Sequence, residues 1–157
     1  LGLAFTDADH LRPEHIGADD NGQLWIHKPR EKTAVMSRIP LLPYTVGLLR
    51  KYEHDKTCVE RGRMLPIPSN NKMNAYLKEI ATICNIDKNL TTHCARHTFA
   101  CLAVEYGMPI DVLAKILGHS NTNMTRHYAK FSEQLIGREM RKMNEHIFSE
   151  QIPLLNS

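Results

Sequence analysis

Apolar side chains recur every three or four residues along most of the second half of the chain, which is the period of an amphipathic helix. The expected helices cover residues 44–54, 69–84, 92–106, 110–117 and 132–148, with one more short helix that carries Tyr128. Ser69, the pair Thr91 and Thr92, and Pro109 favour helix starts, and Gly118 favours a helix end. The pattern therefore predicts a mainly helical domain.

The first forty residues follow a different pattern. Short apolar runs near residues 15–16, 23–27 and 35–42 are separated by polar turns, of which Asp-Asp-Asn-Gly at residues 19–22 is the strongest. We expect three short strands here, after a helical stretch in residues 1–11. The predicted fold class is mainly α with a small three-stranded antiparallel β-sheet, an α+β domain.

Three of the predicted helices carry apolar positions that should face the core. These are Met73, Tyr76, Leu77, Ile80, Ala81 and Ile83 in the first helix; Phe99, Leu102, Ala103 and Tyr106 in the second; and Leu135, Ile136, Met140, Met143 and Ile147 in the third. Residues 55–68 contain one glycine and two prolines, and we expect a loop there. Residues 151–157 are expected to form a loose tail.

Composition adds little to this picture. The 157 residues include 20 Lys and Arg against 17 Asp and Glu, which permits a nucleic-acid partner without requiring one. Cys94 and Cys101 would lie about 10 Å apart on a helix, so we expect reduced, mostly buried thiols in a cytoplasmic protein. No stretch predicts a signal peptide or a membrane span. The chain begins without Met and as if within a helix, so we expect that an N-terminal portion is missing.

Candidate chemistry concentrates in residues 92–130. His93, Arg96 and His97 lie three and four positions apart, so a helix would place them on one face. A guanidinium suits two phosphate oxygens at once, and an imidazole exchanges its proton near neutral pH. Tyr128 as a nucleophile would need a base or nearby cations, because only roughly one phenol in a thousand is ionised at pH 7. His93 is the candidate base.

His93 and His97 are also spaced like a pair of metal ligands. However, no Glu follows His93 as in the His-Glu-x-x-His zinc motif, and no carboxylate or Cys pair completes a ligand set. The sequence also lacks a Gly-rich phosphate-binding loop. We therefore expect neither a metal site nor a cofactor.

The order and spacing of these residues resemble the tyrosine recombinase, or phage integrase, family. The motif His-x-x-Arg-His-x-Phe-Ala begins at His93 and contains Arg96, a Leu-Gly-His-Ser segment contains His119, and Tyr128 follows nine residues later. In that family the corresponding residues belong to the active site. The resemblance implies the catalytic-domain fold of the family, with catalytic roles for all four residues.

The resemblance extends to the predicted β-hairpin. The family carries a catalytic lysine on the turn of this hairpin, often directly before a threonine. Lys32 precedes Thr33 at that place and is the implied candidate, with Lys28 as the alternative. Its role would be general acid to the leaving 5′ oxygen, which contributes ~10²–10⁴ in rate.

One residue departs from the family pattern. Where the family has a first arginine in a Gly-Leu-Arg motif, this chain has Ala4, followed by Asp7 at a position where an acidic residue is expected. Arg12, Arg30 and Arg38 are candidate replacements, and the sequence does not rank them. The wording Gly-Leu-Ala-Phe-Thr-Asp, with a later Ile-Pro-Leu-Leu-Pro, resembles integrases of mobile elements from the Bacteroidetes.

The resemblance implies a two-step DNA transesterification through a 3′-phosphotyrosyl link, without a cofactor. The implied partners are double-stranded DNA and a homotetramer assembled on it, with a monomer as the option for the isolated domain and no membrane. The implied location is the bacterial cytoplasm, on the nucleoid when DNA is bound. Residues 1–157 would form a single catalytic domain without the N-terminal DNA-binding domains. Residues 132–157 would be its C-terminal helix and tail, docked on a neighbouring subunit or on its own domain.

Two alternatives stay open on the sequence. A relative that contacts DNA phosphates without cutting is favoured by Ala4, whereas the four intact site residues argue for a recombinase. A single-strand topoisomerase would share the chemistry, but the chain is short for that class and shows no obvious clamp segments.

Overall fold

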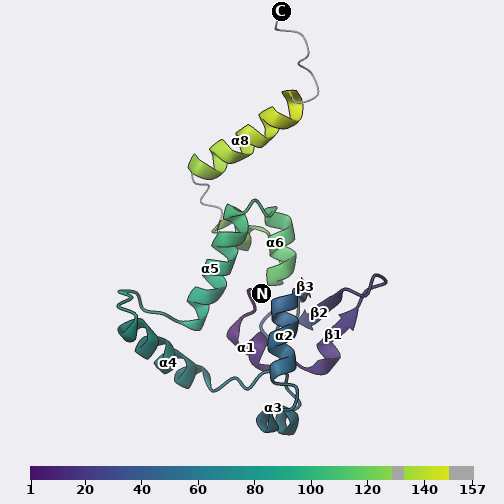
Figure 1. The fold of residues 1–157 in the computed structure, drawn as a ribbon, viewed down its shortest axis with the longest axis vertical. Helices are drawn as coiled ribbons and strands as arrows, with labels where there is room; N and C mark the ends of the chain where they lie inside the picture. The colour runs from purple at the N-terminus through teal and green to yellow at the C-terminus, as the bar shows by residue number, and fades with distance from the viewer. Residues whose placement is uncertain (129–132, 149–157) are drawn as a thin grey trace, which may run out of the picture.

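The structure, a computed structural model of the 157-residue chain, describes residues 1–128 and 133–148. Its elements in chain order are α1 (Phe5–Asp9), the 3₁₀ turn η1 (Pro13–His15), β1 (Ile16–Ala18), β2 (Leu24–Pro29), β3 (Met36–Pro40), α2 (Pro43–Lys51), α3 (Lys56–Arg61), α4 (Asn70–Ile83), α5 (Thr92–Glu105), α6 (Ile110–Leu117), α7 (Asn123–Arg126) and α8 (Glu133–Phe148). Helices dominate and the strands form one small sheet, so the predicted fold class is confirmed (Figure 1).

The sheet consists of β1, β2 and β3 in that order, and both pairings are antiparallel. Ile26 of β2 pairs with Ile39 of β3, and both side chains are buried. In the turn between β1 and β2, the Asp19 carboxylate accepts hydrogen bonds from the backbone N–H groups of Asn21 and Gln23, each at 3.0 Å. The three predicted strands and this turn are confirmed.

Two apolar clusters form the interior, and α6 lies between them. The first cluster consists of Ala100, Ala103, Val104, Leu113, Leu117 and Leu135, and the second of Leu11, Ile26, Ile39, Leu41 and Leu49. Leu113 and Leu117 of α6 belong to the first cluster, whereas Ile116 of the same helix packs against the second. The end of α6 is therefore fixed from both sides, and His119 follows directly after it.

Four of the main helices, α4, α5, α6 and α8, begin and end within one residue of the predicted bounds, whereas α2 ends at Lys51, three residues before its predicted end. The hydroxyls of Ser69 and Thr91 cap α4 and α5 by accepting backbone hydrogen bonds from the first turns. Gly118 ends α6 in the left-handed conformation, with φ of 61°. Because Thr91 is the cap, α5 starts at Thr92 and Arg96 lies one turn inside the helix.

The expectation of a loop throughout residues 55–68 was wrong, because α3 lies within it. Asp55 caps α3 by accepting a hydrogen bond from the backbone N–H of Cys58 at 3.0 Å, and Gly62 ends the helix with φ of 60°. Six residues are too few to show a helical period, so the two prolines that follow dominated the prediction.

Several predicted core positions are exposed. They are Tyr76, Ile80 and Ile83 on α4, Leu102 and Tyr106 on α5, and Ile136, Met140 and Met143 on α8. Much of α4 and α8 extends away from the body of the molecule (Figure 1), which agrees with the exposure of these side chains. The α5 helix turns its small residues inward instead. The side chain of Ile147, residue 132 and the predicted tail lie outside the described part of the chain.

The four cysteines are free, as predicted, but the expectation that most are buried was wrong. Cys58 is buried, Cys84 is exposed at the end of α4, and Cys94 and Cys101 are half-buried. Among the described residues, no helix combines the length and the apolar character that crossing a bilayer would need.

Candidate active site where α5, α6 and α7 meet

Arg96 is the buried centre of the site, and only 6% of the residue is exposed. Its guanidinium donates hydrogen bonds to the carbonyl oxygens of Gly2 and Leu117, the latter at 2.7 Å, and Nη2 lies 3.1 Å from Nε2 of His119. Burial, and next the neighbouring Arg30, lower the pKa of Arg96 to about 10, so it is cationic at neutral pH. Within the described part of the chain, these bonds use three of the five guanidinium N–H groups, so two can bind a ligand.

His119 is held through both ring nitrogens. Because Arg96 can only donate, Nε2 of His119 accepts that hydrogen bond and carries no proton. Nδ1 then carries the proton and donates to Oγ1 of Thr125 at 2.8 Å. Thr125 lies in α7 and is fully buried. Burial, followed by the charges of Arg96 and Arg30, lowers the pKa of His119 to about 4, which agrees with a neutral ring.

Tyr128 lies just beyond the end of α7, and its ring contacts two histidines. The ring centroids of Tyr128 and His97 are 5.2 Å apart in an edge-on arrangement, and those of Tyr128 and His119 are 6.4 Å apart and nearly parallel. The Tyr128 ring also packs against the first apolar cluster, and the residue interacts electrostatically with Arg96. The structure therefore brings together three residues of the predicted set: Arg96, His119 and Tyr128.

His93 and Lys32 are more peripheral. His93 is exposed on the first turn of α5, and Lys32 is exposed in the turn between β2 and β3. Lys28, the alternative lysine, is only 2% exposed, and its Nζ lies 2.8 Å from Oε1 of Glu31. The catalytic roles of His93 and Lys32 stay predictions.

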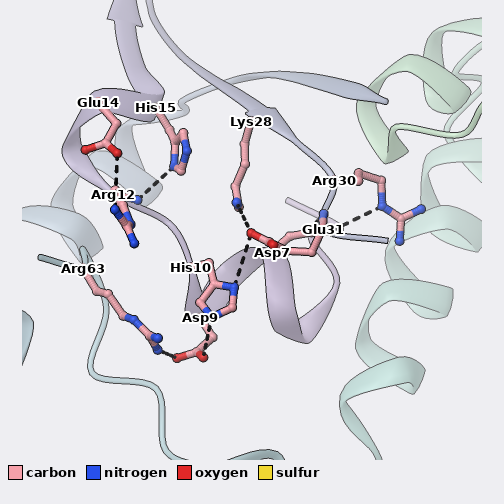
Figure 2. A network of polar contacts seen from close by, with 10 residues as sticks. All are labelled: Asp7, Asp9, His10, Arg12, Glu14, His15, Lys28, Arg30, Glu31 and Arg63. Carbon is pink, nitrogen blue, oxygen red and sulfur yellow. Dashed lines mark hydrogen bonds and ion pairs between the residues drawn. The ribbon is translucent and has the colours of Figure 1, made fainter. Parts of the chain in front are cut away.

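A polar network on α1 and the turn between β2 and β3 borders the site (Figure 2). The buried carboxylate of Asp7 accepts a hydrogen bond from the backbone N–H of Glu31 at 2.9 Å and one from Nε of Arg30 at 3.3 Å. Glu31 contacts Lys28 and, at 3.3 Å, His10, and the bond from Lys28 is the main cause of its lowered pKa. Asp7 thereby ties the turn to α1, and Arg30 points from it toward the helices of the site (Figure 2).

Two contacts of the site were not expected from the sequence. Thr125 was not singled out, although it stands three residues before Tyr128, one helical turn away. His97, considered on the sequence as a metal ligand, contacts the Tyr128 ring instead. A threonine in a short polar segment gives no periodic signal, so its burial is visible only once the fold encloses it.

The arrangement suits the binding of a phosphate and its transfer to a phenol. It combines a buried cation with free N–H groups, a neutral imidazole and a tyrosine ring within one small region. Within the described residues, no group of three His, Cys, Asp or Glu side chains is arranged to hold a metal ion.

The chain matches the model of the phage integrase family over residues 10–134. Among curated proteins, the tyrosine recombinase XerD of Halalkalibacterium halodurans is 38% identical over 82 residues, which are 52% of this chain and 26% of the relative. The tyrosine recombinase XerC of Rickettsia peacockii is 27% identical over 130 residues, which are 83% of this chain and 40% of the relative. The chain thus spans less than half the length of these relatives.

Solved structures share the fold. The crystal structure of XerA recombinase has a TM-score of 0.68 at 19% identity and covers 91% of this chain and 53% of its own. The Tn1549 transposon integrase in complex with circular intermediate DNA has a TM-score of 0.63 at 17% identity, and the match covers 90% of this chain and 56% of the integrase chain. The family match includes Arg96, His119 and Tyr128, the three residues that the structure brings together. Because this match covers well over half of the chain, the chain belongs to the phage integrase family of tyrosine recombinases.

Proposed function

We propose that the protein is a site-specific DNA recombinase that cuts and rejoins strands through a 3′-phosphotyrosyl intermediate. The observation that carries this proposal is the position of Tyr128, whose ring lies beside His119 and within electrostatic range of Arg96 in the same chain. A protein that merely binds DNA phosphates needs the guanidinium but has no use for a phenol at this place.

In the first step, the phenolic oxygen of Tyr128 attacks the scissile phosphorus, and the bond from phosphorus to the 5′ oxygen breaks. The phenol loses its proton to a base, and the 5′ oxygen gains a proton from an acid. In the second step, a 5′ hydroxyl of a partner strand attacks the phosphotyrosyl link and releases the phenol. His93 is the proposed proton acceptor, and His97, which contacts the Tyr128 ring, is the alternative.

Arg96 and His119 are proposed to stabilise the negative charge on the non-bridging oxygens. Arg96 has two N–H groups that its contacts with residues 1–128 and 133–148 do not use. In the structure without DNA, His119 turns a lone pair toward Arg96 and cannot donate from Nε2. A bound phosphate would attract the guanidinium N–H groups and favour a proton on Nε2, which converts His119 into a second donor.

Lys32 is the proposed general acid, with the buried Lys28 as the alternative. Lys28 would first have to leave Glu31, whereas the exposed Lys32 is free to approach DNA. The two can be separated with a 5′-bridging phosphorothiolate substrate, since a thiolate leaves without a general acid. Alanine at the true acid should slow cleavage of ordinary DNA by ~10²–10⁴ and barely affect the sulfur substrate. A variant that cleaves ordinary DNA at the wild-type rate excludes that lysine.

The proposed partner is double-stranded DNA, on which the protein would assemble as a homotetramer in the bacterial cytoplasm. Relatives in the structural comparison include XerH bound to its difH substrate and a transposon integrase bound to circular intermediate DNA. The resemblance of residues 2–7 to Bacteroidetes integrases supports a role in the integration of a mobile element. N-terminal DNA-binding domains in the full-length protein would supply most of the sequence specificity.

The test uses the full-length protein and a nicked duplex that contains its binding site, selected beforehand from random-sequence DNA. The nick lets the cleaved end diffuse away, so the covalent intermediate accumulates and is seen after denaturing electrophoresis. We expect an adduct with wild-type protein and none with Tyr128→Phe, which should bind DNA as well as wild type does. Intact DNA binding without any wild-type adduct would instead establish the non-cutting relative that Ala4 favours.

A further inference from the structure

The site as described lacks one phosphate-binding cation. Ala4 occupies the position of the family's first arginine at the start of α1, and its methyl group can neither donate a hydrogen bond to a phosphate nor neutralise its charge. Arg96 alone supplies the guanidinium among the three residues that the structure brings together. A second cation has to come from another part of the fold if charge on the phosphate is to be neutralised from two sides.

Two of the three candidate arginines lie in unsuitable places. Arg12 is exposed and pairs with Glu14 at 3.7 Å beside the 3₁₀ turn. Arg38 is exposed on β3, directly opposite the exposed His27. The buried side chain of Ser37, the residue before Arg38, lies against Gly118 at the site. Because neighbouring residues of a strand point to opposite faces, Arg38 faces away from the site.

Arg30 lies against the site. Its side chain is 11% exposed, and its aliphatic part packs on Gly118, the residue before His119. The approach is so close that a Cβ atom at Gly118 would stand 2.6 Å from Cδ of Arg30. Gly118 also needs its left-handed φ of 61°, so glycine both ends α6 and makes room for the arginine.

Asp7 fixes the position of the Arg30 guanidinium through Nε alone. Asp7 accepts a hydrogen bond from Nε at 3.3 Å, which orients the guanidinium, while the terminal nitrogens take no part in this bond. The charge of Arg30 also contributes to the lowered pKa values of Arg96 and His119. Arg30 therefore lies close enough to Arg96 for their charges to repel each other, and an anion that contacts both guanidinium groups would relieve this repulsion.

We propose that Arg30 supplies the second phosphate-binding guanidinium of the active site, in place of the arginine that Ala4 lacks. Asp7 is its positioning residue, and Gly118 provides the space for its side chain. This inference rests on the proposed recombinase function. It predicts a non-bridging phosphate oxygen, rather than a DNA base or a protein group, as the ligand of Arg30.

The test compares Arg30→Ala and Arg38→Ala in the full-length protein with the nicked duplex described above. Arg38 is the matched control because it is an arginine of the same hairpin on the opposite face. We expect Arg30→Ala to slow single-turnover cleavage by ~10²–10³, the typical loss for one charge-stabilising donor, and Arg38→Ala to stay within about tenfold of wild type.

A second substrate separates phosphate contact from structural support. A methylphosphonate at the scissile position removes one negative oxygen, so a residue that neutralises this charge is needed less. The defect of Arg30→Ala should shrink to about tenfold or less on this substrate. A defect of equal size on both substrates would assign Arg30 a structural role, and wild-type cleavage by Arg30→Ala would also overturn the inference. If wild-type protein forms no adduct, the proposed function fails first.

Discussion

His119 shows how strongly a single residue depends on its neighbours at this site. An exposed histidine with an ordinary pKa of about 6.5 would be partly charged at neutral pH. Here burial and two arginines keep the ring neutral down to about pH 4, and the hydrogen bonds to Arg96 and Thr125 select one tautomer. The same contacts that hold the ring therefore determine which atom can donate to a phosphate.

This neutral state predicts how stability depends on pH. The unfolded chain takes up a proton at His119 near pH 6.5, whereas the folded chain does so near pH 4. Between these values the unfolded state binds more protons, so stability falls as pH is lowered from about 6.5 to 4. Urea unfolding at a series of pH values should show this fall in wild type and a shallower one in His119→Gln.

The exposed His93 provides the control for this experiment. His93→Gln should follow the wild-type pH profile, because no buried contact of that residue is lost. Identical profiles for wild type and His119→Gln would contradict the neutral, buried state assigned to His119.

At the scale of elements, the α6 terminus connects the sheet to the site. Gly118 brings α6 to an end, lies against Arg30 and Ser37 of the hairpin, and sets the direction in which His119 leaves the helix. The hairpin and the helix thus depend on one position without a side chain.

Gly118→Ala should therefore destabilise the fold and impair cleavage together. The left-handed conformation costs a residue with a Cβ about 1–2 kcal/mol, and the contact with Arg30 adds to this cost. Gly47→Ala is the control, since Gly47 lies in α2 and an added Cβ there meets nothing within 4 Å. We expect Gly47→Ala to be neutral or stabilising by about 0.5–1 kcal/mol in urea unfolding. Equal effects of the two substitutions would show that Gly118 is not needed for close packing.

Periodicity and capping residues were sufficient to place most helices and all three strands, because both signals are local. Thr91 and Gly118 act through hydrogen bonds and backbone angles within a few residues. Arg30 contacts Gly118, which is distant in the sequence, and Thr125 contacts His119 from a short segment without a periodic pattern. The sequence alone therefore could not show that either residue belongs to the site. The core predictions on α4 and α8 failed for a different reason. The apolar positions of these helices do follow a helical period, but a period does not determine whether another part of the chain packs against them, and many of these side chains are exposed.

At the scale of the whole molecule, α8 is attached at its start and extends outward. Leu135 is buried in the first apolar cluster, and Arg138 donates a hydrogen bond to the carbonyl oxygen of Glu105. Further along, the helix projects from the body (Figure 1), and Met140 and Met143 are about half exposed. These methionines border a groove of about 550 Å³ between α8 and the start of α6. We propose that a second copy of the protein covers this apolar side when subunits assemble on DNA.

Met140→Glu should therefore weaken assembly without unfolding the domain. Met140 is 56% exposed, so its replacement should change the free energy of unfolding by no more than about 0.5 kcal/mol. A charge buried between subunits is costly, so complexes with two-site DNA should shift from tetramer toward lower forms in sedimentation experiments. Gln134→Glu adds the same charge at an exposed position of α8, outside the groove lining, and should leave assembly intact. Equal losses from both substitutions would point to repulsion from DNA, because both add one negative charge and only one of them removes apolar contact area.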